Sequence, residues 1–305
     1  MPTARPISRP ETTKIALAMA KSCFGAGRPE PAPPLRVTPP WYGVADRRRG
    51  QPAVCPRRCG EGLLRWAAAW QYRRAMKVVI AGGHGKIALH LERLLAERGD
   101  HSTGLIRDAA QEADVIAAGA HPVVVDLENT TPAALSEHLA GADAVVFAAG
   151  AGPGSSAERK DSVDRAAAAL LADAATLAGI RRYVLISAIG SDAGPQPDHD
   201  PVFAAYITAK KAADDDLRGR DLDWTVVRPG ALTDASGSGH VTLSSRVGRG
   251  SVPREDVAAV LVAVLDEPRT AGLSLDVVSG RHPVADAVAE TLEASPDDSP
   301  AGTES

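Results

Sequence analysis

Tyr206 and Lys210 have the residue types and the spacing that point most directly to chemistry in this 305-residue sequence. Four residues apart on a helix, their side chains would lie on one face. A nearby ammonium stabilises the phenolate form of a tyrosine, so we expect Lys210 to lower the pKa of Tyr206 toward neutrality. Such a tyrosine can donate a proton to a carbonyl group that accepts hydride, or remove the proton in the reverse reaction.

A second candidate is the glycine-rich segment 82–88, with the sequence Gly-Gly-His-Gly-Lys-Ile-Ala. It lies between an apolar run at 78–81, which predicts a strand, and a stretch at 87–98 whose leucines predict a helix. Backbone N–H groups at the start of a helix attract phosphate, and glycines let a diphosphate approach them closely. The segment therefore predicts a dinucleotide-binding turn, with a purely structural tight turn as the alternative.

The end of the second predicted strand, at 104–107, indicates which nucleotide the turn would bind. An acidic residue there would bind the ribose 2′-hydroxyl of NAD, but the chain has Arg107, followed by Asp108. A guanidinium can pair with a 2′-phosphate, so the sequence favours NADP over NAD, unless Arg107 is a solvated surface residue. Asp126, after the third predicted strand, could bind the adenine amino group or only cap the next segment.

From Met76 onward the sequence alternates between apolar runs and Ala- and Leu-rich stretches with helical spacing. The alternation predicts an α/β fold, a doubly wound parallel sheet of the Rossmann type, in a single domain at 76–288. Besides the first strand and helix, the predicted strands are at 104–107, 122–126, 144–148, 182–187, 224–227 and 273–278, and the predicted helices at 163–178, 203–217 and 254–265.

Five motifs occur in a fixed order along this alternation. They are the glycine-rich segment 82–88, Ala-Ala-Gly-Ala-Gly at 148–152, Ser187, the Tyr206 to Lys210 pair, and Arg-Pro-Gly at 228–230. Together they resemble the atypical branch of the short-chain dehydrogenase/reductase superfamily, the NAD(P)H-binding-domain proteins of the NAD-dependent epimerase/dehydratase type. The resemblance begins at Met76 and does not extend to residues 1–75.

The resemblance implies roles for individual residues. Lys210 would also hold the hydroxyls of the nicotinamide ribose, and Ser187 would polarise the substrate carbonyl. In better-known dehydrogenases the working serine often follows another serine, whereas here Ala188 follows Ser187, and Ser191 could substitute only if the loop folds back. The predicted catalytic residues are thus Tyr206, Lys210 and Ser187. The predicted cofactor-binding residues are Gly82, Gly83, His84, Gly85, Lys86, Ile87, Arg107, Asp126, Leu127, Ala148, Ala149, Gly150, Lys210, Pro229 and Gly230.

Residues 1–75 differ in composition from the rest of the chain. They hold 14 of the 34 Lys and Arg residues but only 4 of the 38 Asp and Glu residues. They also hold 11 of the 23 prolines, which interrupt any periodic pattern and predict a disordered basic extension. The segment could be an arm for nucleic acid or membrane, a targeting peptide, or an addition to a native protein that starts at Met76, which we favour. The polar residues 289–305 predict a disordered tail.

Composition also excludes several classes of protein. No apolar run approaches the roughly 20 residues that span a bilayer, so we expect no membrane segment. All three cysteines lie in 1–75, so the predicted domain has no disulfide or thiolate metal site, and we expect no metal. A reducing, cytoplasmic location fits this distribution. The apolar helix faces would permit a homodimer.

The function that these observations favour is that of an NAD(P)-dependent oxidoreductase of the short-chain dehydrogenase type. The segment 231–252 is too short for a large substrate domain, which favours a small carbonyl, quinone or flavin-like substrate. A non-catalytic NADP(H)-binding sensor is the first alternative, supported by Ala188, and a sugar epimerase is the second. Nucleic-acid binding through 1–75 is the least favoured.

Overall fold

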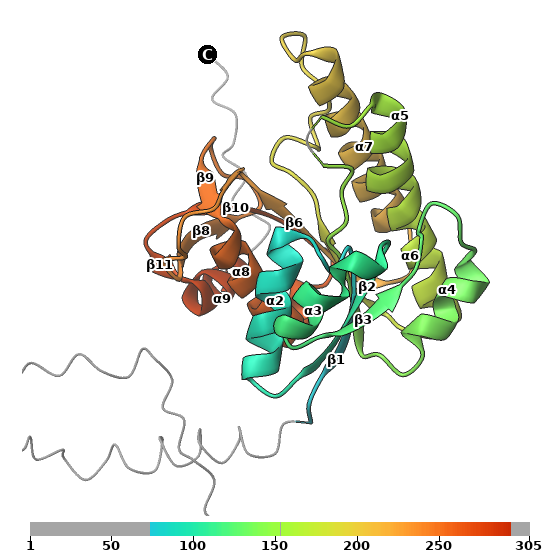
Figure 1. Ribbon diagram of the computed structural model, residues 1–305. Helices are drawn as coiled ribbons and strands as arrows, with labels where there is room; N and C mark the ends of the chain where they lie inside the picture. Colours follow the sequence, from blue (N-terminus) through green and yellow to red (C-terminus); the bar gives the residue numbers. More distant parts are fainter. Residues whose placement is uncertain (1–73, 153, 294–305) are drawn as a thin grey trace, which may run out of the picture. The chain divides into compact units, whose positions relative to one another are not determined.

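A nine-stranded sheet lies at the centre of the computed structural model, which describes residues 74–152 and 154–293 (Figure 1). The strand order is β11-β8-β10-β6-β5-β4-β1-β2-β3, and the strands from β10 to β3 run parallel. The parallel strands are β1 (Lys77–Ala81), β2 (His101–Ile106), β3 (His121–Val124), β4 (Ala144–Phe147), β5 (Arg182–Ile186), β6 (Asp223–Pro229) and β10 (Leu273–Ser279).

Antiparallel pairing extends this sheet at one edge. β8 (His240–Ser244) pairs with β10, and β11 (His282–Pro283) pairs with β8. β7 (Ala231–Thr233) and β9 (Ser251–Pro253) form a separate two-stranded sheet. The segment after β6 is thus used for short strands and forms no separate substrate domain.

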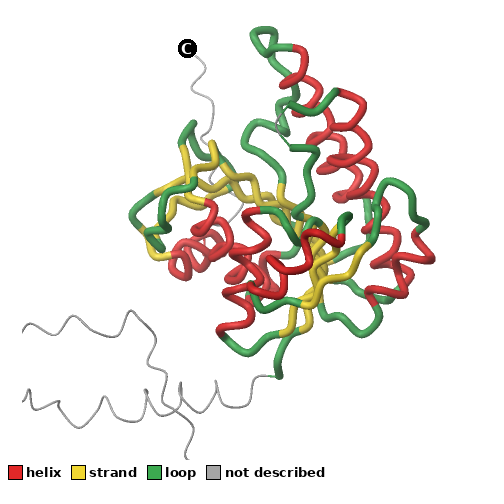
Figure 2. The backbone as a smooth tube through the Cα atoms, in the orientation of Figure 1, coloured by secondary structure: helices red, strands yellow, loops and turns green. Residues whose placement is uncertain are grey.

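Helices cover both faces of the sheet (Figures 1 and 2). The alternation along β1 explains the two layers, because Val78 and Ile80 belong to one apolar core and Val79 and Ala81 to the other. The helices α2 (Lys86–Glu97), α8 (Arg254–Asp266) and α9 (Val284–Glu293) cover the first face, and α4 (Pro132–Leu139), α6 (Ala167–Leu177) and α7 (Pro201–Arg218) the second. The remaining elements are η1 (Ala109–Gln111), α3 (Glu112–Ala117), α5 (Ala157–Lys160), the π-helical turn η2 (Asp161–Ala166) and η3 (Pro268–Thr270).

Local sequence signals fix where α7 begins. Asp200 precedes the helix, and its Oδ1 accepts hydrogen bonds from the backbone N–H groups of Val202 and Phe203, each at 3.0 Å. Pro201 follows at the first helical position, where its missing N–H removes no helical hydrogen bond. The start of α7 is thereby fixed five residues before Tyr206.

The predicted doubly wound parallel sheet is confirmed, and the strands and helices named from the sequence are present with shifted ends. One predicted helix, at 163–178, was wrong in detail, because the π-helical turn η2 precedes α6 and carries residues 161–166. α9 runs to Glu293, so residues 289–293 of the predicted tail are helical. Apart from Arg74 and Ala75, the predicted extension 1–75 lies outside the described residues.

None of the described helices is both long and apolar enough to cross a membrane.

Candidate functional site

The glycine turn connects β1 to α2 and packs against two neighbouring strands. Gly82 has φ +81°, and a Cβ on it would lie 2.6 Å from the Cα atom of Ala149. A Cβ on Gly83 would lie 2.6 Å from the Cα atom of Gly104 in β2. Both glycines are therefore required by backbone contacts within the protein. Gly85 is the N-cap residue of α2 and makes no side-chain capping bond.

Beside this turn lies a cavity of about 240 Å³ at the carboxyl ends of β1, β2 and β4. Nine of the predicted cofactor-binding residues line it, namely Gly82, His84, Gly85, Arg107, Asp126, Leu127, Ala148, Ala149 and Gly150. The other predicted residues, Gly83, Lys86, Ile87, Lys210, Pro229 and Gly230, are not among its lining residues. Gln111, Glu128 and Arg159 also line the cavity and were not predicted from the sequence.

Several charged side chains are among the residues that line this cavity. Arg107 and Arg159 line it, and Arg159 pairs with Glu128 at 3.0 Å. Asp126 accepts hydrogen bonds from the Asn129 side chain at 2.7 Å and from the backbone N–H of Glu128 at 2.9 Å. These two bonds, with smaller effects of the two arginines, hold the pKa of Asp126 below its usual value. Asp126 thus caps the following turn while it lines the cavity.

Lys86 is directed to a partner outside the cavity. Its Nζ lies 2.6 Å from Oδ2 of Asp234, whose other oxygen contacts Arg254 at 2.6 Å. The ion pairs lie on the surface, so they contribute little to stability. His84 lines the cavity, and its Nε2 lies 2.8 Å from Oδ2 of Asp114 in α3.

Tyr206 and Lys210 lie on the same side of α7, as their spacing predicts. The Nζ atom of Lys210 is 5.8 Å from the centre of the Tyr206 ring. Lys210 is 4% exposed, and its Nζ donates a hydrogen bond to the backbone oxygen of Ile186 at 3.0 Å. It also forms an ion pair with Oδ1 of Asp164 at 3.1 Å. Lys210 is therefore held between the end of β5 and the turn η2.

Asp164 was not among the predicted site residues. It is 1% exposed in η2, and its Oδ2 accepts a hydrogen bond from the backbone N–H of Ala151 at 3.2 Å. One carboxylate thus connects Lys210 to the loop that follows β4. The signal in the sequence is that Asp164 lies next to Val163 and three residues before Ala167, both of which are buried. An acidic residue on the inward side of a helix needs a charged partner.

The predicted fall in the pKa of Tyr206 was wrong. Burial is the largest effect and raises the pKa of Tyr206 above its usual value of 10.0. Lys210 opposes this rise, while the carboxylates of Asp164 and Asp214 add to it. The spacing of the two residues reveals only the ammonium, whereas the fold also withdraws the phenol from water and places two carboxylates near it.

Ser187 lies at the end of a buried chain of polar groups that includes Ser191. The Ser187 hydroxyl donates to Oγ of Ser191 at 3.3 Å, and the Ser191 hydroxyl donates to Oδ2 of Asp214 at 2.7 Å. Arg228 donates to the same oxygen at 3.1 and 3.2 Å. The loop after β5 therefore folds back, as a role for Ser191 requires, but the Ser191 hydroxyl is bonded to Asp214.

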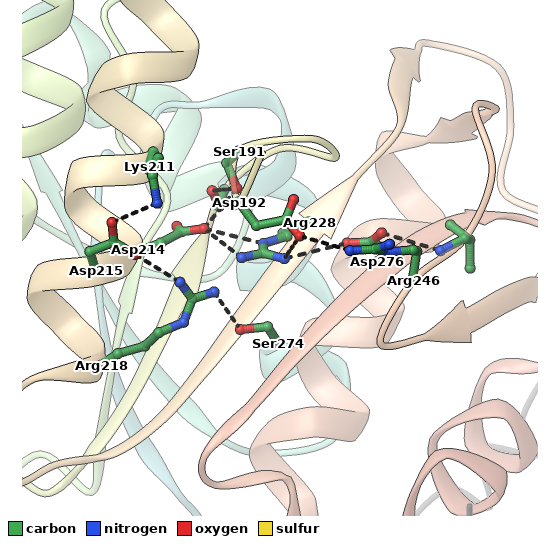
Figure 3. Close-up of polar contacts among 12 residues, drawn as sticks. Ser191, Asp192, Lys211, Asp214, Asp215, Arg218, Arg228, Arg246, Ser274 and Asp276 are labelled. Carbon is green, nitrogen blue, oxygen red and sulfur yellow. Dashed lines mark hydrogen bonds and ion pairs between the residues drawn. The ribbon is translucent and has the colours of Figure 1, made fainter. Parts of the chain in front are cut away.

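Arg228 connects three elements at the end of β6 (Figure 3). Its guanidinium lies between Asp214 of α7 and Asp276 of β10, with the Asp276 carboxylate 4.0 Å away. Burial raises the pKa of Asp276 above its usual value. Arg228 was expected only as part of the Arg-Pro-Gly motif, and this buried network was not predicted from the sequence.

Pro229 and Gly230 end β6 and hold neighbouring segments in place. The Pro229 carbonyl accepts a hydrogen bond from the N–H of Ile189 at 3.1 Å. A Cβ on Gly230 would lie 2.4 Å from the backbone oxygen of Gly250. Gly230 is therefore required by the close approach of the segment before β9.

A match to a known protein family shows to which family the chain belongs. Residues 82–268, from the glycine turn to η3, match the model of a family described as NAD(P)H-binding. The chain belongs to the NAD(P)H-binding family. This match confirms the resemblance drawn from the motifs.

Relatives and solved structures of this family agree with the assignment. The chain is 34% identical over 214 residues to the uncharacterized sugar epimerase YhfK of Bacillus subtilis, covering 70% of this chain and 99% of the relative. A Bacillus halodurans structure assigned to the NAD-dependent epimerase/dehydratases is 33% identical, with a TM-score of 0.65, and covers 71% of this chain and all of that one. The structure of the oxidoreductase ylbE of Lactococcus lactis is 26% identical, with a TM-score of 0.61, and the match covers 72% of this chain and 97% of that one.

The cavity of this NAD(P)H-binding protein fits the diphosphate of a dinucleotide. The first N–H groups of a helix have no acceptor within the helix. In α2 no side chain caps them, and no acidic residue in the first turn competes with a phosphate for them. Gly82 and Gly85 line the same cavity without side chains. Within 74–152 and 154–293, no cluster of three or more His, Cys, Asp or Glu side chains could hold a metal ion.

Proposed function

We propose that the chain is an NADPH-dependent oxidoreductase that reduces a small carbonyl, quinone or flavin-like substrate. The observation that carries the proposal is the pair of partly buried Tyr206 and buried Lys210, with Lys210 held by Ile186 and Asp164. A buried ammonium next to a phenol is the arrangement that a proton donor to a reacting oxygen requires. Membership of an NAD(P)H-binding family supplies the hydride donor.

Each part of the site has a task in this reaction. The turn at Gly82 and Gly85 and the N-terminus of α2 would bind the diphosphate. Lys210 donates only two of its three protons to Ile186 and Asp164, so one is left for a ribose hydroxyl. The cofactor, when bound, supplies the hydride that forms the new C–H bond at the carbonyl carbon.

Tyr206 would donate the proton that the carbonyl oxygen needs as its carbon accepts hydride. Because burial raises the pKa of Tyr206, the phenol is protonated at neutral pH and can act as the acid. Reduction should therefore persist at low pH and decline as the pH rises through the pKa of Tyr206.

Arg107 supports a preference for NADP over NAD. It lines the cavity beyond the second strand, where a 2′-phosphate would lie, and Arg159, which is paired with Glu128, also lines the cavity. Replacing Arg107 with Ala should weaken the affinity for NADPH about tenfold and leave that for NADH unchanged. Equal losses for both nucleotides in calorimetry would contradict the assignment.

A non-catalytic NADP(H) sensor is the second candidate. The feature that favours it is the Ser187 hydroxyl, which is bonded into a buried chain and is followed by Ala188 in place of a second serine. A sugar epimerase is less favoured, because the segment after β6 forms only the short strands β7, β8 and β9.

Turnover by wild type and the Tyr206→Phe variant separates the two candidates. NADPH oxidation is followed with panels of carbonyls, quinones and flavins, and NADPH affinity is measured for both proteins. An oxidoreductase loses about a hundredfold or more in kcat on Tyr206→Phe and keeps its NADPH affinity. Tight NADPH binding without turnover of any substrate class would overturn the enzyme and favour the sensor.

A further inference from the structure

Lys160 is a second buried lysine beside Tyr206. It is the last residue of α5 and is 7% exposed, and its Nζ lies 5.3 Å from the centre of the Tyr206 ring. The Nζ atom donates one hydrogen bond among the described residues, to Oγ of Ser155 at 3.3 Å. In the same part of the chain, no carboxylate forms an ion pair with Lys160.

The neighbours of Lys160 along the chain are paired. Arg159 contacts Glu128, and Asp161 contacts Arg165, both at the surface. Lys160 differs from them because it is turned inward, toward α7, and has only a neutral partner. Its inward position is therefore not explained by an ion pair.

The two ammonium groups beside Tyr206 differ in their partners. Those of Lys160 and Lys210 both lie within 6 Å of the ring centre. Asp164 forms an ion pair with Lys210, and Asp214 is bonded to Arg228 and Ser191. Among the described residues, Lys160 is therefore the one of the two lysines without a carboxylate in an ion pair.

A buried ammonium without a counterion is unfavourable, and a bound anion removes the penalty. Three donors on a compact head suit a carboxylate or a phosphate oxygen. We propose that Lys160 forms an anion subsite next to Tyr206 and binds the carboxylate of the substrate. The proposal rests on the proposed function and specifies the substrate as a carbonyl compound that carries a carboxylate.

The separation in this site indicates where that carboxylate lies in the substrate. The Nζ atom of Lys160 lies 5.3 Å from the centre of the Tyr206 ring, so the ammonium and the phenol would contact groups close together in one molecule. An oxo acid with its carbonyl next to the carboxylate, or one carbon removed, meets this condition. Its reduction gives the hydroxy acid, with the hydride from NADPH on carbon and the proton from Tyr206 on oxygen.

A matched pair of probes tests the subsite. Benzoylformate and its methyl ester share one ketone and differ in the negative charge. Each is titrated by calorimetry into the full chain saturated with NADP⁺, in wild type, Lys160→Met, Lys160→Arg and Lys211→Met. Lys211 is the control, because it lies at the surface of α7 and pairs with Asp215.

We expect wild type and Lys211→Met to bind benzoylformate about tenfold or more tightly than the ester. Lys160→Met should lose this preference. Lys160→Arg keeps the charge and should retain part of the preference. The Arg variant also provides the test if Lys160→Met does not fold. Equal binding of the two probes by wild type, or an unchanged preference in Lys160→Met, would overturn the proposal. The proposal would also be overturned if Lys160→Met lost affinity for NADPH but kept the preference for benzoylformate. Lys160 would then bind a cofactor phosphate.

The Tyr206→Phe variant separates this proposal from the proposed function. It should keep the preference for benzoylformate, because Lys160 is unchanged. If wild type shows the preference but reduces no carbonyl compound, the proposed function fails while the anion subsite stands. If it reduces carbonyl compounds without preferring the acid, the subsite fails alone.

Discussion

Asp164 illustrates how single side chains at this site act on one another through charge. Its carboxylate is buried, pairs with Lys210 and accepts a hydrogen bond from the N–H of Ala151. It also raises the pKa of Tyr206, against the effect of Lys210. The protonation of the tyrosine is therefore set jointly by burial, one ammonium and the carboxylates of Asp164 and Asp214.

Replacing Asp164 with Asn should lower the pKa of Tyr206, because the substitution removes a negative charge that favours the phenol over the phenolate. The phenolate would then form at lower pH than in wild type. Ultraviolet absorption during a pH titration measures this, with Tyr206→Phe to identify the contribution of Tyr206. Asp161→Asn, at the surface of the same turn, is the control, and an unchanged titration in Asp164→Asn would contradict the charge argument.

Gly82 offers a second test at the scale of one residue. Gly82→Ala places a methyl group 2.6 Å from the Cα atom of Ala149 on a backbone with φ +81°. Gly141 has a similar φ of +75°, but a Cβ there meets nothing within 4 Å. Gly141→Ala should lower the free energy of unfolding by about 1–2 kcal/mol, the cost of a left-handed backbone. Gly82→Ala should lower the free energy of unfolding clearly more than Gly141→Ala does, and it should also weaken NADPH binding. Equal decreases for the two variants in urea unfolding would contradict the role of the contact with Ala149.

At the scale of elements, α2 carries a buried carboxyl group beneath the glycine turn. Glu92 is 0% exposed, and neither carboxyl oxygen has a hydrogen-bond partner among the described residues. A Cβ on Gly104 would lie 2.6 Å from its Oε1, and one on Gly83 3.0 Å. Burial raises the pKa of Glu92 to about 8. The helix that would bind the diphosphate therefore packs against β2 across a buried carboxyl group that is neutral at pH 7.

This pKa predicts how the stability of the protein depends on pH. The pKa of Glu92 in the folded protein, about 8, exceeds its usual value of 4.5. The stability that this raised pKa contributes is therefore complete below pH 4.5 and is lost as the pH rises toward 8. Glu92→Gln cannot ionise and should remove this part of the decline. Urea unfolding at pH 5 and pH 8 measures the difference, with Glu97→Gln at an exposed position of α2 as the control. The same decline in Glu92→Gln as in wild type would contradict the role of Glu92.

The elements that could be predicted from the sequence are those with strong periodic signals. The central strands β1, β4 and β5 are apolar runs, because both of their faces are covered by helices. The short strands β7, β8, β9 and β11 lie in a polar segment and depend on pairing that no local pattern reveals. α9 was not predicted as a helix, and the domain was expected to end at 288, because a Ser- and Pro-rich segment follows α9.

At the scale of the whole molecule, the parallel sheet brings motifs that are far apart in the sequence together at the carboxyl ends of its strands. The turn after β1, the loop after β4 and the end of β5 lie at the carboxyl ends of their strands, where open α/β sheets bind ligands. That rule made the cavity-lining residues predictable from order along the chain. The buried pairs of Asp164 with Lys210 and Asp214 with Arg228 were not predictable, because they join elements whose contacts arise only on folding.

Calorimetric titration of the full chain with NADPH and with NADH tests the central claim most directly. We predict one dinucleotide bound per chain, with NADPH bound more tightly than NADH and displaced by NADP⁺. The absence of heat of binding for both nucleotides, at protein concentrations where the chain is folded, would contradict the account.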